Sequence, residues 1–243
     1  MEIKWKPITH NETYTHPSLI EIKGIVLHSI GTPQPNAEKI INQFDSFSAG
    51  ASCHAVVDGL TGEAYQCLPW NYRGWHCGVG EKGSANANYI GVETGEPDCI
   101  KYVPNSGRFE VLDEERAKTI ATIAYWGAVN LFAYLCQKFG LNPADEGVII
   151  SHKEAHDMGI ASNHVDPTHL WTGLNLPFTM NGFRSDVLTA CHELNYYPDL
   201  DEDEMDAPQY YRVQVGAYSY RSNAERMMKK LKDAGFPTYM VYY

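Results

Sequence analysis

Histidine residues gather at a few places in this chain. The ten histidines include two in apolar runs typical of strands, one after a turn and four within 18 residues: His28 and His54, His76, and His152, His156, His164 and His169. A lone histidine in a strand is usually a satisfied structural residue, so the interpretation depends on the combination. Because imidazole is the commonest metal-binding side chain in proteins, the clustering predicts a metal site.

Three of the candidate ligands fit a hydrolytic zinc ion. Such an ion takes three protein ligands and leaves a fourth position for water. His28 and His152 lie at the ends of strand-like runs, which hold a ligand rigidly, and Asp166 can return from the loop that follows. His156, one helical turn after His152, is an alternative ligand in an i, i+4 pair. Since zinc acidifies a bound water that can attack a carbonyl carbon, the set predicts one zinc ion per chain and hydrolysis.

Glu93 is the candidate for handling the proton of that water. It stands in the middle of the apolar run YIGVET (89–94), where a core residue is expected. Burial raises the pKa of a carboxyl group into the range useful for a general base. The sequence therefore predicts that Glu93 is the catalytic carboxylate.

Short strands separated by helices must position these residues. Four runs rich in β-branched residues predict strands: GIVLHSI (24–30), CHAVVD (53–58), YIGVET (89–94) and GVIIS (147–151). The longest predicted helix covers 113–139, with Asp113 as its N-cap and Gly140 as the glycine that ends it. Its many apolar residues predict a helix largely buried across a sheet, so the fold class is α/β.

The composition limits the partners of the chain. Of its 243 residues, 44% are hydrophobic and 20% are charged, as in a globular protein. The formal net charge of -11 argues against a nucleic-acid partner, because phosphate binding relies on clustered Lys and Arg. No apolar run reaches the roughly 20 residues of a membrane span, and the start MEIKWKPITH is unlike a signal peptide. We therefore expect no membrane partner and synthesis in the cytoplasm.

The six cysteines do not indicate a metal or redox motif. None of them falls into a C-x-x-C pair. Free buried thiols are therefore expected, with disulfide pairing as the alternative if the protein acts outside the cell.

Charge and proline divide the chain into three parts. The acidic run DLDEDEMD (199–206) has proline close to both sides, and it predicts a solvated linker over 195–207. The alternative is an acidic surface loop within one domain. With the linker, the predicted parts are a main domain over 1–194 and a small unit over 208–243.

The pattern of this last unit predicts a β-α-β arrangement. Val213 and Val215 alternate with polar residues as in a strand, and Ser222 and Glu225 have the spacing of a capping box at the start of a helix. The unit carries six basic and two acidic side chains. It is too small to bury its own core, so another element must complete it.

The motifs around the candidate residues together resemble the type 2 N-acetylmuramoyl-L-alanine amidases. The resemblance covers about residues 20–175, in the family's order: VLHSIGT, SCHAVVDG, GWHCG, NYIGVETGE and SHKEAHDMGIASNHVDP. It implies a mixed central sheet flanked by helices and one zinc ion. It also implies hydrolysis of the amide between the lactyl group of N-acetylmuramic acid and the L-alanine of the stem peptide.

The resemblance assigns the zinc ligands and the catalytic carboxylate to the same four residues, His28, His152, Asp166 and Glu93. Two positions before the last ligand the family often has a lysine that polarises the substrate carbonyl, and here that residue is His164. Imidazole can stabilise an oxyanion but loses its charge near neutral pH, so we expect activity to weaken above neutrality. Some relatives place a tyrosine near the metal where this chain has Cys53, so no tyrosine role is transferred.

The resemblance also implies a substrate groove. Its positions correspond to His54, His76 and Asn88, and aromatic side chains nearby can stack on sugar or peptide faces: Trp75, Trp70 and Tyr72. Aromatic residues beside a turn are also common as cover for a core. We expect substrate contacts from His54, His76, Asn88 and Trp75, and from Trp70 less.

The C-terminal unit resembles one half of a sporulation-related repeat (SPOR) domain, a module that binds peptidoglycan glycan strands. Two β-α-β halves normally form one four-stranded sheet. The single half predicts either a truncated chain or a homodimer that pairs two halves. An unrelated extension packed on the main domain is the alternative.

Together the resemblances imply a peptidoglycan hydrolase of the endolysin or autolysin kind, which reaches the wall as phage lysins do. One alternative is a peptidoglycan-binding protein of the same fold without activity, which the presence of all three ligands disfavours. Another is a zinc hydrolase that acts on a different acylated amino sugar or peptide, which the wall-binding unit disfavours.

Overall fold

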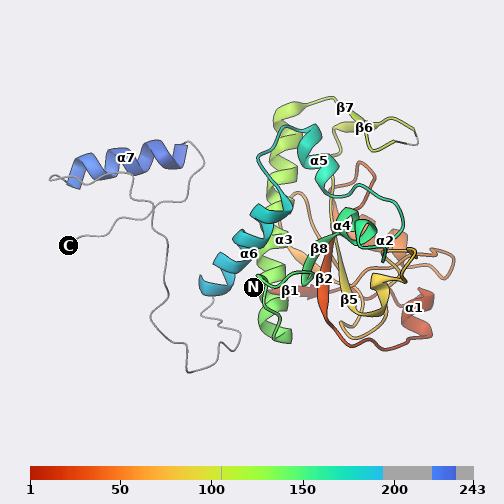
Figure 1. Ribbon diagram of the computed structural model, residues 1–243. Coiled ribbons are helices and arrows are strands. Elements are labelled where there is room, and N and C mark those ends of the chain that lie inside the picture. Colours follow the sequence, from red (N-terminus) through yellow and green to blue (C-terminus); the bar gives the residue numbers. More distant parts are fainter. Residues whose placement is uncertain (105, 194–220, 234–243) are drawn as a thin grey trace, which may run out of the picture. The chain divides into compact units, whose positions relative to one another are not determined.

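A six-stranded mixed sheet forms the centre of the first of two units, Met1–Asp199 and Leu200–Tyr243 (Figure 1). The computed structural model describes residues 1–104, 106–193 and 221–233. In their order across the sheet, the strands are β1 (Ile3–Trp5), β4 (Ala64–Gln66), β3 (Ala55–Val57), β5 (Tyr89–Thr94), β2 (Gly24–Ser29) and β8 (Ile149–Ser151). β3 and β4 pair antiparallel, and the other neighbours pair parallel. The predicted α/β class with a mixed sheet is confirmed.

Helices cover both faces of this sheet. They are α1 (Glu12–Thr15), α2 (Ala37–Phe44), the 3-10 helix η1 (Ala85–Ala87), α3 (Glu114–Phe139), α4 (His152–Asp157), α5 (Thr168–Gly173) and α6 (Met180–Glu193). Figure 1 shows α3 and α6 together on one face, whereas α2 and α4 lie on the other. A separate hairpin consists of β6 (Ile100–Tyr102) and β7 (Phe109–Val111).

The long helix α3 begins and ends where the sequence predicts. The side chain of Asp113 accepts a hydrogen bond from the backbone N–H of Arg116 at 3.0 Å, and Gly140 has the left-handed φ of 63° that suits glycine. Within the described part of the chain, α3 is the one helix long and apolar enough to cross a membrane, but two thirds of that stretch is buried in the protein. It is therefore the core helix of the unit.

Strand β2 presents its side chains alternately to two cores. Ile25 and Leu27 pack in the larger core with α3 and α6, whereas Val26 packs with Ala155 of α4 on the opposite face. Because side chains alternate along a strand, His28 lies on the same face as Val26. The chemistry-bearing face is thus the one covered by α4.

Parallel pairing brings the ends of three strands together. His28 lies opposite Glu93 in the β2–β5 register, and Leu27 lies opposite Ser151 in the β2–β8 register. His152 follows Ser151 directly, so it emerges beside His28. Ligands commonly bind at the carboxyl ends of parallel strands, and here this edge gathers the predicted site residues.

One helix of the second unit is described, α7 (Arg221–Asp233). It begins at Arg221, one residue before Ser222, the first residue of the predicted capping box. The predicted linker over 195–207 and both predicted strands of the β-α-β unit lie outside the described residues. The domain boundaries therefore stay a prediction.

Candidate metal centre and active site

The three predicted zinc ligands meet at the carboxyl edge of the sheet. His28 Nδ1 lies 3.1 Å from both His152 Nδ1 and Asp166 Oδ2, and His152 Nδ1 lies 3.5 Å from Asp166 Oδ1. All three side chains are buried. Donor atoms bound at roughly 2.0–2.1 Å to a tetrahedral zinc ion are about 3.3–3.4 Å apart. The observed spacings therefore fit the ligand set of a single metal ion.

A capping network fixes His152 at the first position of α4. Ser151 is the N-cap, and Ser151 and Glu154 form a reciprocal capping box. Arg184 of α6 donates hydrogen bonds to both carboxylate oxygens of Glu154 and to the carbonyl oxygen of Ile149. The helix start that carries the ligand is thus fastened to both the last strand and α6.

The hydrogen bond that His152 makes through Nε2 determines which of its ring nitrogens carries the proton. Ser162 Oγ donates its hydrogen to the carbonyl oxygen of Cys77 at 3.1 Å. Ser162 Oγ can therefore only accept from His152 Nε2, which lies 3.4 Å away. Neutral His152 then carries its proton on Nε2, and its Nδ1 presents a lone pair to the site, as a metal ligand requires.

The electrostatics of the group favour one positive charge at its centre. Burial lowers the pKa of His28, but the carboxylates of Glu93 and Asp166 raise it more, and the net direction is upward. Burial acts to raise the pKa of Asp166, yet its hydrogen bond to His28 holds that pKa below the ordinary value. Burial and the neighbouring His28 lower the pKa of His152 to about 4. A carboxylate with two imidazoles that face each other is the charge arrangement that binds a divalent cation.

Glu93 lies beside this group with an unsatisfied oxygen. Its side chain is 8% exposed, and Oε2 has no hydrogen-bond partner among the described residues. Burial raises the pKa of Glu93 to about 8, although the nearby His28 acts to lower it. A buried carboxyl oxygen without a partner is rare and often marks a functional group. The setting is that of the predicted general base.

His164 lies at the exposed edge of the site. Its ring centroid is 4.4 Å from that of His152, and its Nδ1 lies 3.0 Å from Ser162 Oγ. An exposed imidazole next to the ligands can face a bound carbonyl group. The position agrees with the oxyanion role that the resemblance implies.

The alternative ligand His156 does not join the group. Its Nδ1 lies 3.2 Å from the carbonyl oxygen of Ala161, so the ring is bonded to the backbone. In the described residues, the donor groups able to hold a metal ion do not include it.

The six cysteines are free thiols, five of them buried and Cys99 partly exposed. Cys53, at the position where some relatives have a tyrosine, is fully buried, and its Sγ lies 3.8 Å from Cys67 Sγ. Burial raises the pKa of the Cys53 thiol well above its ordinary value. Cys53 is therefore a packed neutral thiol and offers no hydroxyl to the site.

Two residues predicted to line the groove lie elsewhere. His54 is fully buried, its Nδ1 accepts from the N–H of Gly91 at 2.9 Å, and its Nε2 lies 2.7 Å from the carbonyl oxygen of Tyr72. Both ring nitrogens thus bond to the backbone, and His54 joins β5 to the loop around Tyr72. Asn88 donates to the carbonyl oxygen of Glu21 at 3.2 Å and precedes β5, at the end of that strand opposite to the catalytic edge. The structure thus places His54 in the interior and Asn88 away from the catalytic edge, and their substrate contacts stay predictions.

The two tryptophan candidates for substrate contact differ in their exposure to solvent. Trp75 is 36% exposed and is held through its backbone, which pairs with Ser52, so its ring is available to a ligand. Trp70 is 9% exposed and belongs to the larger core. Trp75 stays a candidate for substrate contact, and Trp70 is a core residue.

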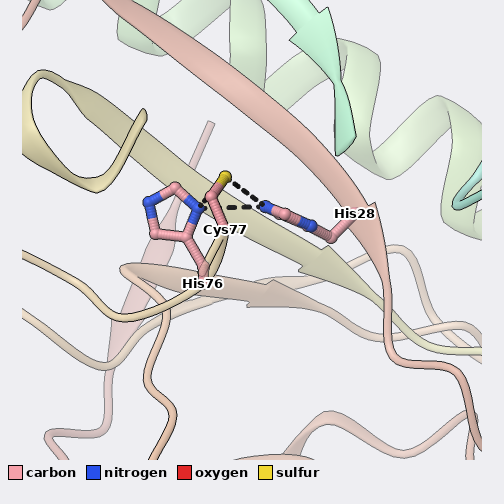
Figure 2. Close-up of side chains that lie close together, drawn as sticks. All are labelled: His28, His76 and Cys77. Carbon is pink, nitrogen blue, oxygen red and sulfur yellow. Dashed lines mark hydrogen bonds between the residues drawn. The ribbon is translucent and has the colours of Figure 1, made fainter. Parts of the chain in front are cut away.

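His76 turns toward a ligand rather than toward solvent (Figure 2). Its Nδ1 lies 3.0 Å from His28 Nε2, and Cys77 Sγ lies 3.1 Å from the same atom and 3.8 Å from His28 Nε2. Burial and the nearby His28 lower the pKa of His76 well below its ordinary value, and burial raises the pKa of the Cys77 thiol. Both are neutral groups behind the metal ligand, an arrangement that the sequence does not reveal.

Another buried carboxyl group, that of Glu96, is absent from the sequence-based candidates. It accepts hydrogen bonds from Ser29 Oγ at 2.6 Å, the N–H of Gly31 at 3.0 Å and the Tyr102 hydroxyl at 2.7 Å. Burial raises the pKa of Glu96 to about 7 against the lowering effect of these bonds. Tyr102 also lies 2.7 Å from His169 Nε2, so the network joins β6 and α5 to the end of β5. Its one sequence signal is an ionisable residue just after an apolar strand.

Two family profiles match the chain. The family described as N-acetylmuramoyl-L-alanine amidase matches residues 18–169, and the SPOR domain matches residues 207–243. Among curated proteins, none matches this sequence.

Solved structures share the fold of the first unit. The structure of PlyL is 21% identical and covers 77% of this chain and 97% of its own, with a TM-score of 0.53. The Staphylococcus aureus hydrolase AmiA, solved with its ligand, is 15% identical over 82% of this chain and 88% of its own, with a TM-score of 0.58. The catalytic domain of XlyA is 20% identical over 77% of this chain and 99% of its own, with a TM-score of 0.53.

Proposed function

The chain belongs to the N-acetylmuramoyl-L-alanine amidase family, and we propose that it cuts peptidoglycan with one zinc ion held by His28, His152 and Asp166. The family match confirms the resemblance that the motifs indicate. The bond cut is the amide between the lactyl group of N-acetylmuramic acid and L-alanine. The observation that carries the proposal is the convergence of three buried donors beside the unpartnered oxygen of Glu93.

The residues of the site divide the chemistry among them. A zinc ion held by His28, His152 and Asp166 would polarise the scissile carbonyl and acidify the attacking water. Glu93 takes the proton of that water and returns it to the amine of L-alanine as the carbon–nitrogen bond breaks. His164 in its protonated form, with Nδ1 donating to Ser162 Oγ, donates from Nε2 to the carbonyl oxygen as negative charge develops there. Trp75 packs against a sugar or peptide face and helps to orient the bond.

We assign attachment to the wall to the C-terminal unit. The SPOR match over 207–243 supports binding to peptidoglycan, and the six basic side chains over 208–243 suit a polymer rich in carboxylates. We further propose the domain limits 1–194, 195–207 and 208–243. A homodimer through this unit is part of the proposal.

Metal analysis coupled to a lysis assay tests the proposed function. Purified protein is expected to hold about one zinc ion per chain, and chelation is expected to abolish the clearing of bacterial sacculi until zinc is restored. His28→Ala and Asp166→Ala should lose both zinc and lysis. His10→Ala is the matched control, because its side chain is exposed and lies outside the donor group.

The same assay separates the alternatives. Sacculus binding without soluble products would identify a binding protein of this fold. Full lysis by zinc-free protein would remove the metal from the mechanism.

A further inference from the structure

The hydrogen bonds behind His28 determine which of its nitrogens carries a proton. His76 Nε2 lies 3.2 Å from the carbonyl oxygen of Tyr89, which can only accept, so Nε2 bears the hydrogen. Neutral His76 then has a lone pair on Nδ1. His28 Nε2, 3.0 Å from that lone pair, must donate to it.

This chain of bonds ends at the metal centre. When His28 is neutral, as a metal ligand must be, a proton on Nε2 leaves a lone pair on Nδ1, which lies 3.1 Å from both Asp166 Oδ2 and His152 Nδ1. A metal-binding histidine commonly gives its other N–H to a partner that fixes the ring and the tautomer. Here that partner is a second imidazole, itself anchored on the backbone of β5.

The fold leaves a fitted space for the His76 ring. A Cβ atom at Gly91 of β5 would lie 2.3 Å from His76 Cγ, and one at Gly74 would lie 3.1 Å from His76 Cδ2. Gly91 precedes Glu93 by two residues and so shares its face of the sheet. The His76 ring therefore occupies the space that the missing side chain of Gly91 leaves on β5, the strand of the general base.

We propose that His76 is a positioning residue for the metal, which accepts the Nε2 hydrogen of His28 and so keeps His28 Nδ1 free to bind zinc. The inference rests on the proposed zinc function and deepens it. The motif predicts a substrate contact for His76, and the proposal instead gives His76 the role of orienting the zinc ligand His28.

Cys77 provides the competing explanation. Its Sγ lies 3.1 Å from His76 Nδ1 and 3.8 Å from His28 Nε2, so these three atoms form a second donor group. A cation held there would require His28 to give up its last proton while its Nδ1 binds zinc. An imidazole N–H is also a stronger donor than a thiol, so His28 rather than Cys77 fills the lone pair of His76.

The test compares zinc affinities of full-length variants by competition with a chromophoric chelator. His76→Leu removes the acceptor at similar size, and its Kd for zinc is expected to rise by about 10- to 100-fold. His76→Asn keeps an acceptor oxygen near the place of Nδ1 and should recover most of the affinity. Cys77→Ala is the matched control and should bind zinc as the wild type does.

Two further readouts separate this role from general packing. Long-range ¹⁵N–¹H spectra of the zinc-loaded wild type should show His28 with its proton on Nε2. Gly91→Ala, which displaces the His76 ring without removing any imidazole, should weaken zinc binding as His76→Leu does, with the fold checked by circular dichroism.

The outcomes are distinguishable. Failure of the wild type to bind zinc would overturn the proposed function itself. A His76→Leu variant with wild-type zinc affinity, or a second zinc ion per chain that disappears in Cys77→Ala, would overturn the role of His76 alone.

Discussion

Glu96 shows how burial and hydrogen bonding compete in this site, and the competition has a measurable consequence. Its side chain is fully buried, and burial raises its pKa to about 7 from an ordinary value of 4.5, although three groups donate hydrogen bonds to it. The folded protein therefore binds this proton more tightly than the unfolded chain does. As a result, ionisation of Glu96 opposes folding.

The sign and size of the effect follow from this difference. The contribution of Glu96 to the free energy of unfolding is highest below about pH 4.5 and falls as the pH rises to about 7, above which it is constant. Because one pH unit corresponds to about 1.4 kcal/mol, the fall between these limits is roughly 3 kcal/mol.

Glu96→Gln removes this proton equilibrium and keeps a side chain of similar shape. We expect urea unfolding of the full chain, with zinc at saturation, to show the variant gaining roughly 3 kcal/mol relative to the wild type between about pH 4.5 and pH 8. Lost hydrogen bonds shift both points equally, so the change with pH is the informative quantity. Glu110→Gln, at an exposed glutamate, should show no such change. A difference for Glu96→Gln that does not vary with pH would refute the reasoning, because it would mean that the three donors keep the carboxylate ionised throughout.

Four further predictions address the remaining parts of the account. Glu93→Gln should keep zinc and sacculus binding but lose about 10²- to 10⁴-fold in hydrolysis rate, and near wild-type turnover would make another group the base. Arg184→Met, which frees the start of α4, should lower the unfolding free energy by about 1–3 kcal/mol in urea titrations, and unchanged stability would show that the capping box suffices. His164→Lys should extend lysis to pH values above neutrality, whereas an identical pH profile would remove His164 from the oxyanion role. Deletion of 208–243 should weaken sacculus binding and abolish any dimer in sedimentation while leaving turnover of soluble muropeptides intact; equal binding by both proteins would contradict the wall-anchor proposal.

Local patterns in the sequence were enough to predict the central strands and the long helix of the fold. Strands β2, β5 and β8 have apolar β-branched runs that stand out from their surroundings, and the ends of α3 follow from a capping aspartate and a glycine with positive φ. His28 and His152 became candidate ligands because each lies at the end of such a run or just beyond it, whereas Asp166 lies on the loop before α5. The short strands β1 and β4 have no comparable run, since IKW contains one β-branched residue and AYQ contains none.

Local sequence patterns could not predict the contacts between residues that are distant along the chain. The place of His76 depends on a gap at Gly91 and on the carbonyl oxygen of Tyr89, and neither is visible in the motif around His76. Motif position alone suggested groove contacts for His54 and Asn88, but burial and strand direction place them elsewhere. Residue type predicted the chemistry of these side chains, whereas only packing shows what each one faces.

Mass spectrometry of the products released from purified sacculi tests the central proposal most directly. Zinc-loaded protein is expected to release stem peptides with a new free amino group on L-alanine and to leave glycan strands with intact lactyl groups and no new reducing ends. Protein treated with a chelator should release no stem peptides from the sacculi. New reducing sugar ends, or cleavage between amino acids of the stem peptide, would contradict the assignment of the bond.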